Sequence, residues 1–436
     1  MNIFGFSGKH SLVPKAQKQR IFHDLLPAIK NMEQIFQASY ERPDSFITLP
    51  SDEKSLQQVM SLVNEKKQLQ PVCMVVCGIG GSNLGTKAVY EALFGMFGNK
   101  KFLLYFADTV DSDYIKNLLD IVEKHLQANE SILLTIISKS GSTTETIANF
   151  ECFLMLLRSY YPQTYHQLVI AITDFNSPLW KIATENKFST LTIPQQVPGR
   201  FSILSAVGLF PLACADVDIE KLCAGARIMN THGLSLILEN NEPAHSACII
   251  AAQYANGIRI HDLFVFNIAL ESLGKWYRQL MAESLGKELD NEGKKIYAGI
   301  TPTVSVGSTD LHSVGQLYLG GPYDKFTTFV TVECPLKTVT VPDYPEYQKL
   351  VPHIQKKSFA TIMQAIFKGV QNAYTQNKRP YITTTLAQIN EYYLGQWLQF
   401  KMIEISYLGN LLNVNTFDQP HVELYKTQTR KILANE

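Results

Sequence analysis

The sequence predicts an α/β protein with two doubly wound, mainly parallel sheets in tandem, followed by a helical C-terminal region. Short apolar runs alternate with helical patterns between residues 72 and 193, which is typical of parallel strands joined by helices. The alternation returns more loosely between residues 263 and 340, and a chain of 436 residues is too long for one ordinary core. From residue 345 onward the pattern becomes strongly helical.

The expected elements follow one another along the chain. Residues 1–40 are expected to form a helical lead-in, with the helix starting at about residue 17. The strands expected in the first sheet are 72–77, 102–106, 131–137, 168–173 and 189–193. Those expected in the second sheet are 263–268, 303–307, 326–333 and 336–340. Helices are expected around 346–377 and 386–411, with a last helix after Pro420.

The domain boundary is expected near the helical stretch 203–230. We therefore assign residues 41–215 to the first domain and residues 216–436 to the second. No low-complexity linker separates the two halves, so we expect them to pack closely.

The composition argues against several classes of protein. Lys plus Arg equals Asp plus Glu at 39 each, so no net field attracts nucleic acid or an anionic membrane. No apolar run approaches the ~18 residues of a membrane-spanning helix. The seven cysteines form no CxxC pair and the ten histidines show no zinc-binding spacing. We therefore expect a cytoplasmic protein with reduced thiols and without a metal.

A glycine-rich loop, GIGGSNLG at residues 78–85, follows the first buried strand and precedes a helix. Glycines let backbone amides approach a ligand, and a helix N-terminus favours an anion. A dinucleotide fingerprint would need glycine where Asn83 stands, and a P-loop would need lysine where Thr86 follows Gly85. The loop therefore argues against a nucleotide-binding oxidoreductase or kinase.

A second loop, SKSGSTTE at residues 138–145, follows the strand SILLTII. Five hydroxyls and one lysine lie between Ser138 and Thr144, directly before a helix. An ordinary helix cap needs one or two such hydroxyls. Five of them, at the carboxyl end of a parallel strand, favour a cradle for a dianion such as a phosphate monoester.

The pentapeptide ESLGK occurs twice, at residues 271–275 and 283–287, within one predicted helix. Twelve residues at about 100° each rotate the second copy by roughly 120°, so the two glutamates cannot share a helix face. Glu271 stands at the helix start, where the dipole favours a carboxylate. Glu283 stands near the end, before Gly286, where the dipole raises its proton affinity. The two copies therefore have different environments.

Six segments, in order, resemble the phosphoglucose isomerase family, whose members are built from two sugar-isomerase (SIS) domains. They are GIGGSNLG (78–85), SKSGSTTET (138–146), PGRFSILSAVGLFP (198–211), QLMAESLGK (279–287), DLHSVGQLYLGGP (310–322) and NTFDQPHVELYK (415–426). The resemblance implies an aldose–ketose isomerase that interconverts glucose 6-phosphate and fructose 6-phosphate, without a cofactor. It also implies a homodimer.

The family's roles carry over residue by residue. Glu283 resembles the base that moves a proton between carbons 1 and 2, and Arg200 the group that stabilises the cis-enediolate. His312 and Lys426 resemble the ring-opening pair, and the histidine reaches the site from the partner subunit in the family. The substrate-binding residues implied by the motifs are Gly80, Gly81, Ser82, Ser138, Lys139, Ser140, Thr143, Gln279 and Gln419.

Two other functions stay open at this point. A dual glucose/mannose phosphate isomerase would carry the same groups and would also accept mannose 6-phosphate. A sugar-phosphate sensor built from SIS domains would keep the phosphate cradle and lack the base. The presence of Glu283, Arg200, His312 and Lys426 favours an enzyme over a sensor.

Overall fold

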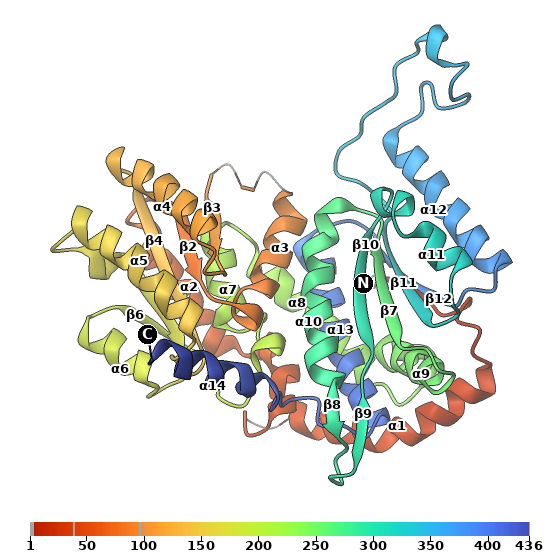
Figure 1. Ribbon diagram of the computed structural model, residues 1–436, viewed down its shortest axis with the longest axis horizontal. Helices are drawn as coiled ribbons and strands as arrows, with labels where there is room; N and C mark the ends of the chain where they lie inside the picture. Colours follow the sequence, from red (N-terminus) through yellow and green to blue (C-terminus); the bar gives the residue numbers. More distant parts are fainter. Residues whose placement is uncertain (1–3, 38–39, 96–97, 100, 436) are drawn as a thin grey trace.

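The computed structural model describes residues 4–37, 40–95, 98–99 and 101–435. Two five-stranded sheets lie side by side with a layer of helices between them (Figure 1). This confirms the predicted α/β class with mainly parallel sheets and a helical C-terminal region. Within the described residues, no helix combines the length and apolar character needed to span a bilayer.

The first sheet has the strand order β3-β2-β4-β5-β6, and all its neighbours are parallel. Its strands are Pro71–Cys77 (β2), Leu103–Ala107 (β3), Ser131–Ile137 (β4), Val169–Thr173 (β5) and Ser189–Thr192 (β6). Its helices are Glu53–Lys67 (α2), Leu84–Phe94 (α3), Ser112–Gln127 (α4), Thr144–Tyr160 (α5) and Pro178–Glu185 (α6). All five predicted strands are present, and the central strands β2, β4 and β5 are almost fully buried apolar runs, as expected for a sheet covered on both faces.

The second sheet has the order β1-β12-β11-β7-β10. Its parallel strands are Ile260–Val265 (β7), Thr301–Val306 (β10), Lys325–Val332 (β11) and Tyr381–Leu386 (β12). The strand Gly5–Ser7 (β1), from the opposite end of the chain, pairs antiparallel with β12. The helices Gly315–Gly320 (α11) and Phe359–Gln376 (α12) follow β10 and β11 in the chain.

Several helices fill the space between and beneath the two sheets. They are Lys15–Phe36 (α1), Ala206–Cys214 (α7), Ile219–Gly233 (α8), Glu242–Ala255 (α9), Glu271–Leu285 (α10) and Glu391–Leu411 (α13). Helix α10 packs on α3 of the first half and on β10 of the second, and α13 is buried along most of its length. The two halves therefore share one continuous apolar core.

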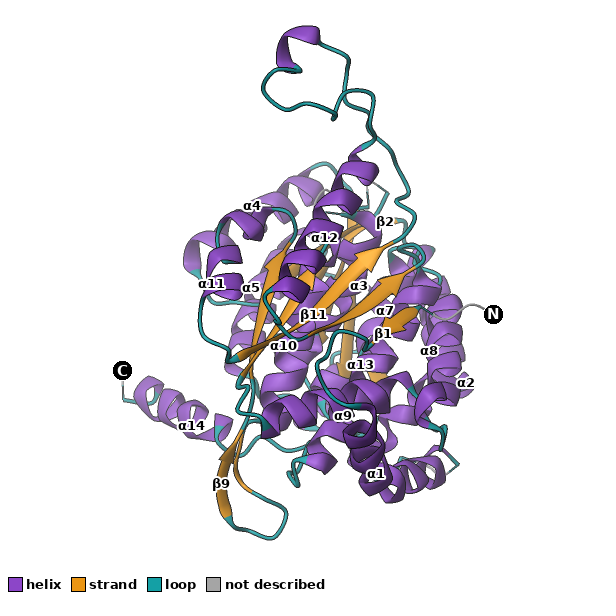
Figure 2. Ribbon diagram, turned by 90° about the vertical axis from the view of Figure 1, so that its right-hand side faces the viewer, coloured by secondary structure: helices purple, strands orange, loops and turns teal. Residues whose placement is uncertain are grey.

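Three parts of the second half differ from the prediction. Residues 336–340 form no strand, because this run leaves the sheet with Leu336 and Val339 exposed. The helix expected from residue 346 begins only at Phe359, after an extended arm (residues 335–358) that projects from the body (Figure 2). Strand β12 was missed, although its β-branched run ITTT carries a clear strand signal.

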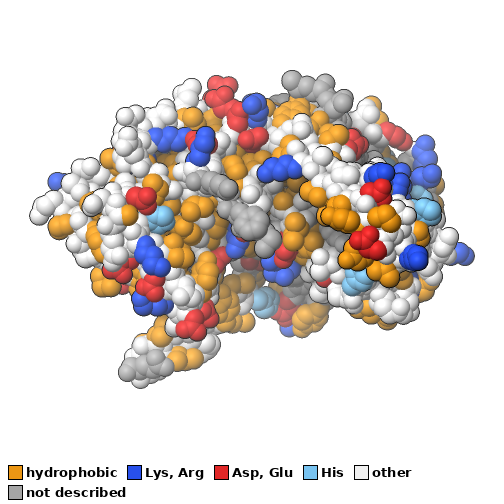
Figure 3. Space-filling model, turned by 90° about the horizontal axis from the view of Figure 1, so that it is seen from above, with side chains coloured by type: hydrophobic (Ala, Val, Ile, Leu, Met, Phe, Trp, Pro, Cys, Tyr) orange, Lys and Arg blue, Asp and Glu red, His pale blue; other side chains and the backbone are white. Residues whose placement is uncertain are grey.

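Two peripheral elements complete the chain. A hairpin of Lys287–Leu289 (β8) and Lys295–Ala298 (β9) projects after α10, and the last helix is Val422–Leu433 (α14). Helix α14 starts just after Pro420, as predicted, and none of its residues is buried. On the face drawn in Figure 3, acidic and basic side chains are interspersed, in line with the balanced composition.

Candidate active site

The two loops noticed in the sequence lie at the same edge of the first sheet. The loop 78–85 follows β2, and the loop 138–145 follows the neighbouring strand β4. From this pair of strands the chain continues outward in opposite directions, to β3 on one side and to β5 on the other. Open α/β sheets bind ligands in the crevice that forms at such a reversal, outside the carboxyl ends of the strands.

The hydroxyl-rich loop forms a compact turn at this crevice. Ser138 Oγ accepts a hydrogen bond from the Gly141 amide at 3.1 Å and lies 3.2 Å from Thr143 Oγ1. Ser140 Oγ lies 3.1 Å from Ser142 Oγ. Thr143 stands at the N-cap of α5 but its side chain makes no capping bond, so the helix presents its first amides without a side-chain acceptor.

A hollow of about 210 Å³ lies between this turn and α14. Ser140, Thr143 and Thr144 line one side, and Lys426 and Arg430 line the other. The hollow thus combines hydroxyls, a helix N-terminus and two basic side chains, which are groups that can bind phosphate, with the carboxylates of Glu145 and Glu423. Lys426 also forms an ion pair with Glu423 at 2.8 Å.

Lys139 belongs to the same loop, but its side chain bonds to a different segment of the chain. Its Nζ donates to the Val197 carbonyl oxygen at 3.2 Å, and Lys139 does not line the hollow. Burial lowers the pKa of Lys139, the Asp174 carboxylate opposes that shift, and the Arg200 cation adds to it. Lys139 therefore connects the hydroxyl-rich loop with the turn that carries Arg200.

The glycine-rich loop packs tightly against that turn and against α10. A Cβ at Gly81 would lie 2.2 Å from the carbonyl carbon of Gly199, and one at Gly80 would lie 2.9 Å from Gln279 Nε2. Gly80 also has a φ of +60°, which favours glycine. Ser82 closes the short turn through its backbone, which donates to the Ile79 carbonyl at 3.2 Å. The glycines thus permit a close approach of three segments.

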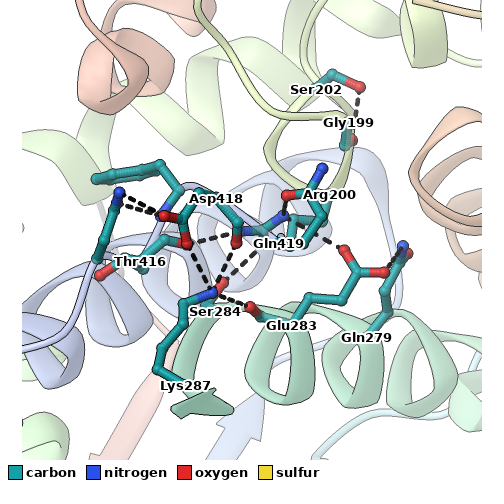
Figure 4. Close-up of polar contacts among 12 residues, drawn as sticks. Gly199, Arg200, Ser202, Gln279, Glu283, Ser284, Lys287, Thr416, Asp418 and Gln419 are labelled. Carbon is teal, nitrogen blue, oxygen red and sulfur yellow. Dashed lines mark hydrogen bonds and ion pairs between the residues drawn. The ribbon is translucent and has the colours of Figure 1, made fainter. Parts of the chain in front are cut away.

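Arg200 is the centre of the polar network beside this loop (Figure 4). Its guanidinium is almost fully buried and donates to Glu283 Oε2 at 3.3 Å and to Gln419 Oε1 at 2.8 Å. It also donates to Ser284 Oγ and to the carbonyl oxygens of Thr416 and Asp418. Burial lowers the pKa of Arg200, and the Glu283 and Asp418 carboxylates oppose that shift. Arginine remains charged in such a setting.

Glu283 occupies the last turn of α10, with about one third of its side chain exposed. Its Oε1 accepts from Gln279 Nε2 at 3.0 Å, one helical turn earlier, while Oε2 faces Arg200. The carboxylate is therefore held from both sides and remains accessible. Glu271 lies in the first turn of the same helix and forms an exposed i,i+4 ion pair with Lys275 at 2.8 Å.

Lys287, which ends the second ESLGK copy, was not predicted as a site residue. Its Nζ donates at 2.6 Å to the carbonyl oxygens of Glu283 and Asp418, and it lies 3.2 Å from the Asp418 carboxylate. Burial and the Arg200 cation lower the pKa of Lys287, whereas Asp418 raises it. Lys287 therefore joins the end of α10 to the loop that carries Gln419. No signal in the sequence distinguishes Lys287, because both motif copies have the same five residues and the corresponding Lys275 is exposed.

His312 lies apart from these groups. It ends the short helical turn Thr309–His312, which follows β10, and it is exposed. Figure 1 places α11, just beyond this turn, at the upper end of the second sheet, whereas β8, which follows Glu283, lies at the lower end. In the described part of the chain, no hydrogen bond or ion pair joins His312 to Glu283, Arg200 or Lys426.

The fold and the site define a two-sheet α/β protein with a hydroxyl-rich turn at a helix N-terminus and a carboxylate that an arginine holds in place. A sequence model of the family described as phosphoglucose isomerase matches residues 63–322. A glucose-6-phosphate isomerase of Carboxydothermus hydrogenoformans is 33% identical over 83% of this chain and 79% of its own length. One of Thermus thermophilus is 33% identical over 89% of this chain and 90% of its own. The chain belongs to the phosphoglucose isomerase family.

Solved structures agree with this assignment. A hypothetical protein from Thermus thermophilus superposes with a TM-score of 0.86 at 30% identity, covering 99% of this chain and all of that one. A glucose-6-phosphate isomerase from Chlamydia trachomatis shares the fold with a TM-score of 0.83 at 20% identity, over 99% of this chain and 88% of that one.

Proposed function

We propose that this protein interconverts glucose 6-phosphate and fructose 6-phosphate, and that Glu283 is the base. The observation that carries the proposal is the Glu283 carboxylate, which Gln279 and Arg200 orient on the last turn of α10, while the side chain of Gln279 also lies against the glycine-rich loop. Removing a weakly acidic C–H proton requires a carboxylate held within reach of the carbon. Glu283 meets this requirement, because two neighbours fix its carboxylate and about one third of its side chain stays exposed.

The proton transfer uses the open-chain sugar. Glu283 takes the proton from carbon 2 of the aldose, and the C–H electron pair forms the carbon 1–carbon 2 double bond of an enediolate. The electrons of the carbon 1 carbonyl move onto oxygen 1, which takes up the proton that oxygen 2 releases. The same carboxyl then returns its proton to carbon 1: the double-bond pair forms the new C–H bond, and a lone pair of oxygen 2 forms the ketone. Arg200 and Gln419 face the developing negative charge, and the phosphate cradle fixes the other end of the sugar.

We assign ring opening to His312 and Lys426, which would remove the proton of the anomeric hydroxyl and deliver one to the ring oxygen. Since His312 lies away from Glu283 in its own subunit, we propose a homodimer in which each subunit completes the partner's site. Lys426, which lines the hollow beside the cradle, belongs to the same subunit as Glu283.

The arm (residues 335–358) supports the dimer. Its base is closed by backbone hydrogen bonds between Val341 and residues 356–357, but its outer part leaves Tyr344, Tyr347 and Leu350 exposed, the last at 74%. Apolar side chains gathered on a projecting segment mark a contact surface. A second copy of this chain is the partner that the His312 arrangement already requires.

The decisive experiment compares Glu283→Gln with Glu271→Gln. Glu283→Gln should bind fructose 6-phosphate yet lose more than ~10³-fold in kcat and cease to exchange the carbon 2 proton with deuterated water. Glu271→Gln, which removes only an exposed ion pair, should remain close to wild type. Equal losses from both variants, with folding intact, would refute the choice of Glu283.

Two alternatives have their own readouts. Turnover of mannose 6-phosphate at a comparable kcat/KM would establish a dual isomerase. Tight binding of sugar phosphate without any proton exchange would establish a sensor. We also propose a cytoplasmic location, which the seven free cysteines support, since reduced thiols are usual in that compartment.

A further inference from the structure

An acidic residue outside the site, Asp262, is completely buried in β7 of the second sheet. Its Oδ1 accepts hydrogen bonds from Thr303 Oγ1 at 2.7 Å and Ser305 Oγ at 3.0 Å, both on the neighbouring strand β10. A third bond comes from the Tyr318 hydroxyl on α11, at 3.0 Å. One carboxylate oxygen thus joins two strands and the helix that covers them.

The surroundings make a carboxylate unexpected at this position. Phe264, two residues along β7 from Asp262, and Phe266, just beyond the strand, pack into an aromatic cluster with Phe329 and Tyr374. In the part of the chain that the structure describes, Asp262 Oδ2 has no hydrogen-bond partner. Burial raises the pKa of Asp262, while its three hydrogen bonds oppose the shift. Aromatic packing alone would be served better by an apolar residue.

The Asp262 network is linked to His312 because β10 and α11, which it joins, lie on either side of the turn that carries His312. His312 lies in the turn between β10 and α11. At the start of this turn, Asp310 Oδ2 accepts from the Val306 amide at 2.7 Å. Beyond it, Arg379 donates to the Leu319 and Gly321 carbonyl oxygens at the end of α11. Tyr318 is the residue of α11 whose side chain reaches down to the sheet.

We propose that Asp262 is a positioning residue, which acts through Tyr318 to hold α11, and with it the turn that carries His312, in the orientation that the partner's site requires. This inference rests on the proposed role of His312 in ring opening. Asp262 touches neither the substrate cradle nor Glu283, so its effect should be confined to the contribution that its own subunit makes to the other active site.

Steady-state kinetics provide the first test. Asp262→Asn and Tyr318→Phe should each lower kcat by roughly tenfold to a hundredfold, the loss expected from a misplacement of about 1 Å, with KM for fructose 6-phosphate nearly unchanged. Tyr374→Phe is the matched control: it removes a buried hydroxyl that bonds to Thr327 in the same cluster, and kcat should stay within about twofold. A wild-type kcat in both Asp262→Asn and Tyr318→Phe would overturn the proposal.

Hybrid dimers, purified with two different affinity tags, separate positioning from general damage. A dimer of one Glu283→Gln subunit and one Asp262→Asn subunit contains one site with an intact Glu283 and a correctly held His312. It should regain about half the wild-type activity per dimer, far above either homodimer. Activity that stays at the level of the Asp262→Asn homodimer would overturn the inference. If Asp262→Asn does not fold, Tyr318→Phe takes its place, because it leaves Asp262 with two donors.

A reference hybrid of Glu283→Gln and His312→Ala distinguishes the inference from the proposal on which it rests. If activity recovers in this reference hybrid but not in the hybrid that contains Asp262→Asn, the role of Asp262 is refuted and that of His312 is not. Failure of recovery in the reference hybrid would refute the transfer of His312 between subunits, and with it the inference.

Discussion

Replacing Arg200 by lysine keeps the charge and removes the planar fork of donors. Arg200 donates five hydrogen bonds, and the ammonium of lysine offers three donors from a single atom, so at least two acceptors lose their partner. Each hydrogen bond to a charged group contributes about 1.5–3 kcal/mol, so we expect Arg200→Lys to lose about 3–6 kcal/mol in the free energy of unfolding. Displacement of the cation should lower kcat by roughly 10²–10³-fold.

Urea unfolding, followed by the fluorescence of the buried residues Trp276 and Trp397, measures the stability, and the conversion of fructose 6-phosphate measures the activity. Arg158→Lys is the control, because Arg158 lies exposed on α5, where it donates to the Tyr165 hydroxyl at 3.3 Å and lies over the Tyr165 ring. Its effect should stay within about 0.5 kcal/mol. An Arg200→Lys protein with the stability and kcat of wild type would refute the role assigned to the fork.

Three further predictions concern other parts of the structure. Lys287→Met should lower kcat/KM by at least roughly tenfold, because the end of α10 loses its tie to the following loop, and normal kinetics in a folded variant would contradict this. Gly81→Ala should lower the stability by about 1–3 kcal/mol in thermal denaturation, whereas Gly369→Ala, in open space on α12, should leave it equal or raise it by up to about 1 kcal/mol. Burial lowers the pKa of His245 from 6.5 to about 4, so the folded protein holds this side chain neutral. The free energy of unfolding should therefore fall by up to about 3 kcal/mol as the pH decreases from 6.5 towards 4. His245→Gln should reduce this loss, which acid titration of the folded protein measures.

The first sheet was predictable because its signal is local. The run VCMVVC of β2 is buried on both faces, and such strands stand out in a sequence as apolar runs with polar ends. Strand β12 and the arm were harder to predict. The threonines of β12 are buried by neighbours that are distant in sequence. The apolar residues of the arm resemble the pattern of a strand or a helix, although many of them are exposed.

The features of the candidate site also differ in whether a local sequence pattern could predict them. The difference between the surroundings of Glu271 and Glu283 follows from their positions in one helix, so the pattern of residues could predict it. The role of Lys287 depends on the carbonyl oxygen of Asp418, more than a hundred residues away, and no local spacing encodes that contact. Asp262 was missed for a related reason, because a lone acidic residue within an apolar strand gives no sign of its three donors.

The pairing of β1 with β12 has a consequence for biosynthesis. The strands of the first sheet span residues 71–192 and can assemble while the rest of the chain is still being translated, since domains fold as units during synthesis. Residues 5–7 emerge from the ribosome several hundred residues before their partner at residues 383–385. Strand β1 must therefore stay unpaired while the intervening segments are made, and once β12 has formed, this short strand covers its outer edge against pairing with other chains.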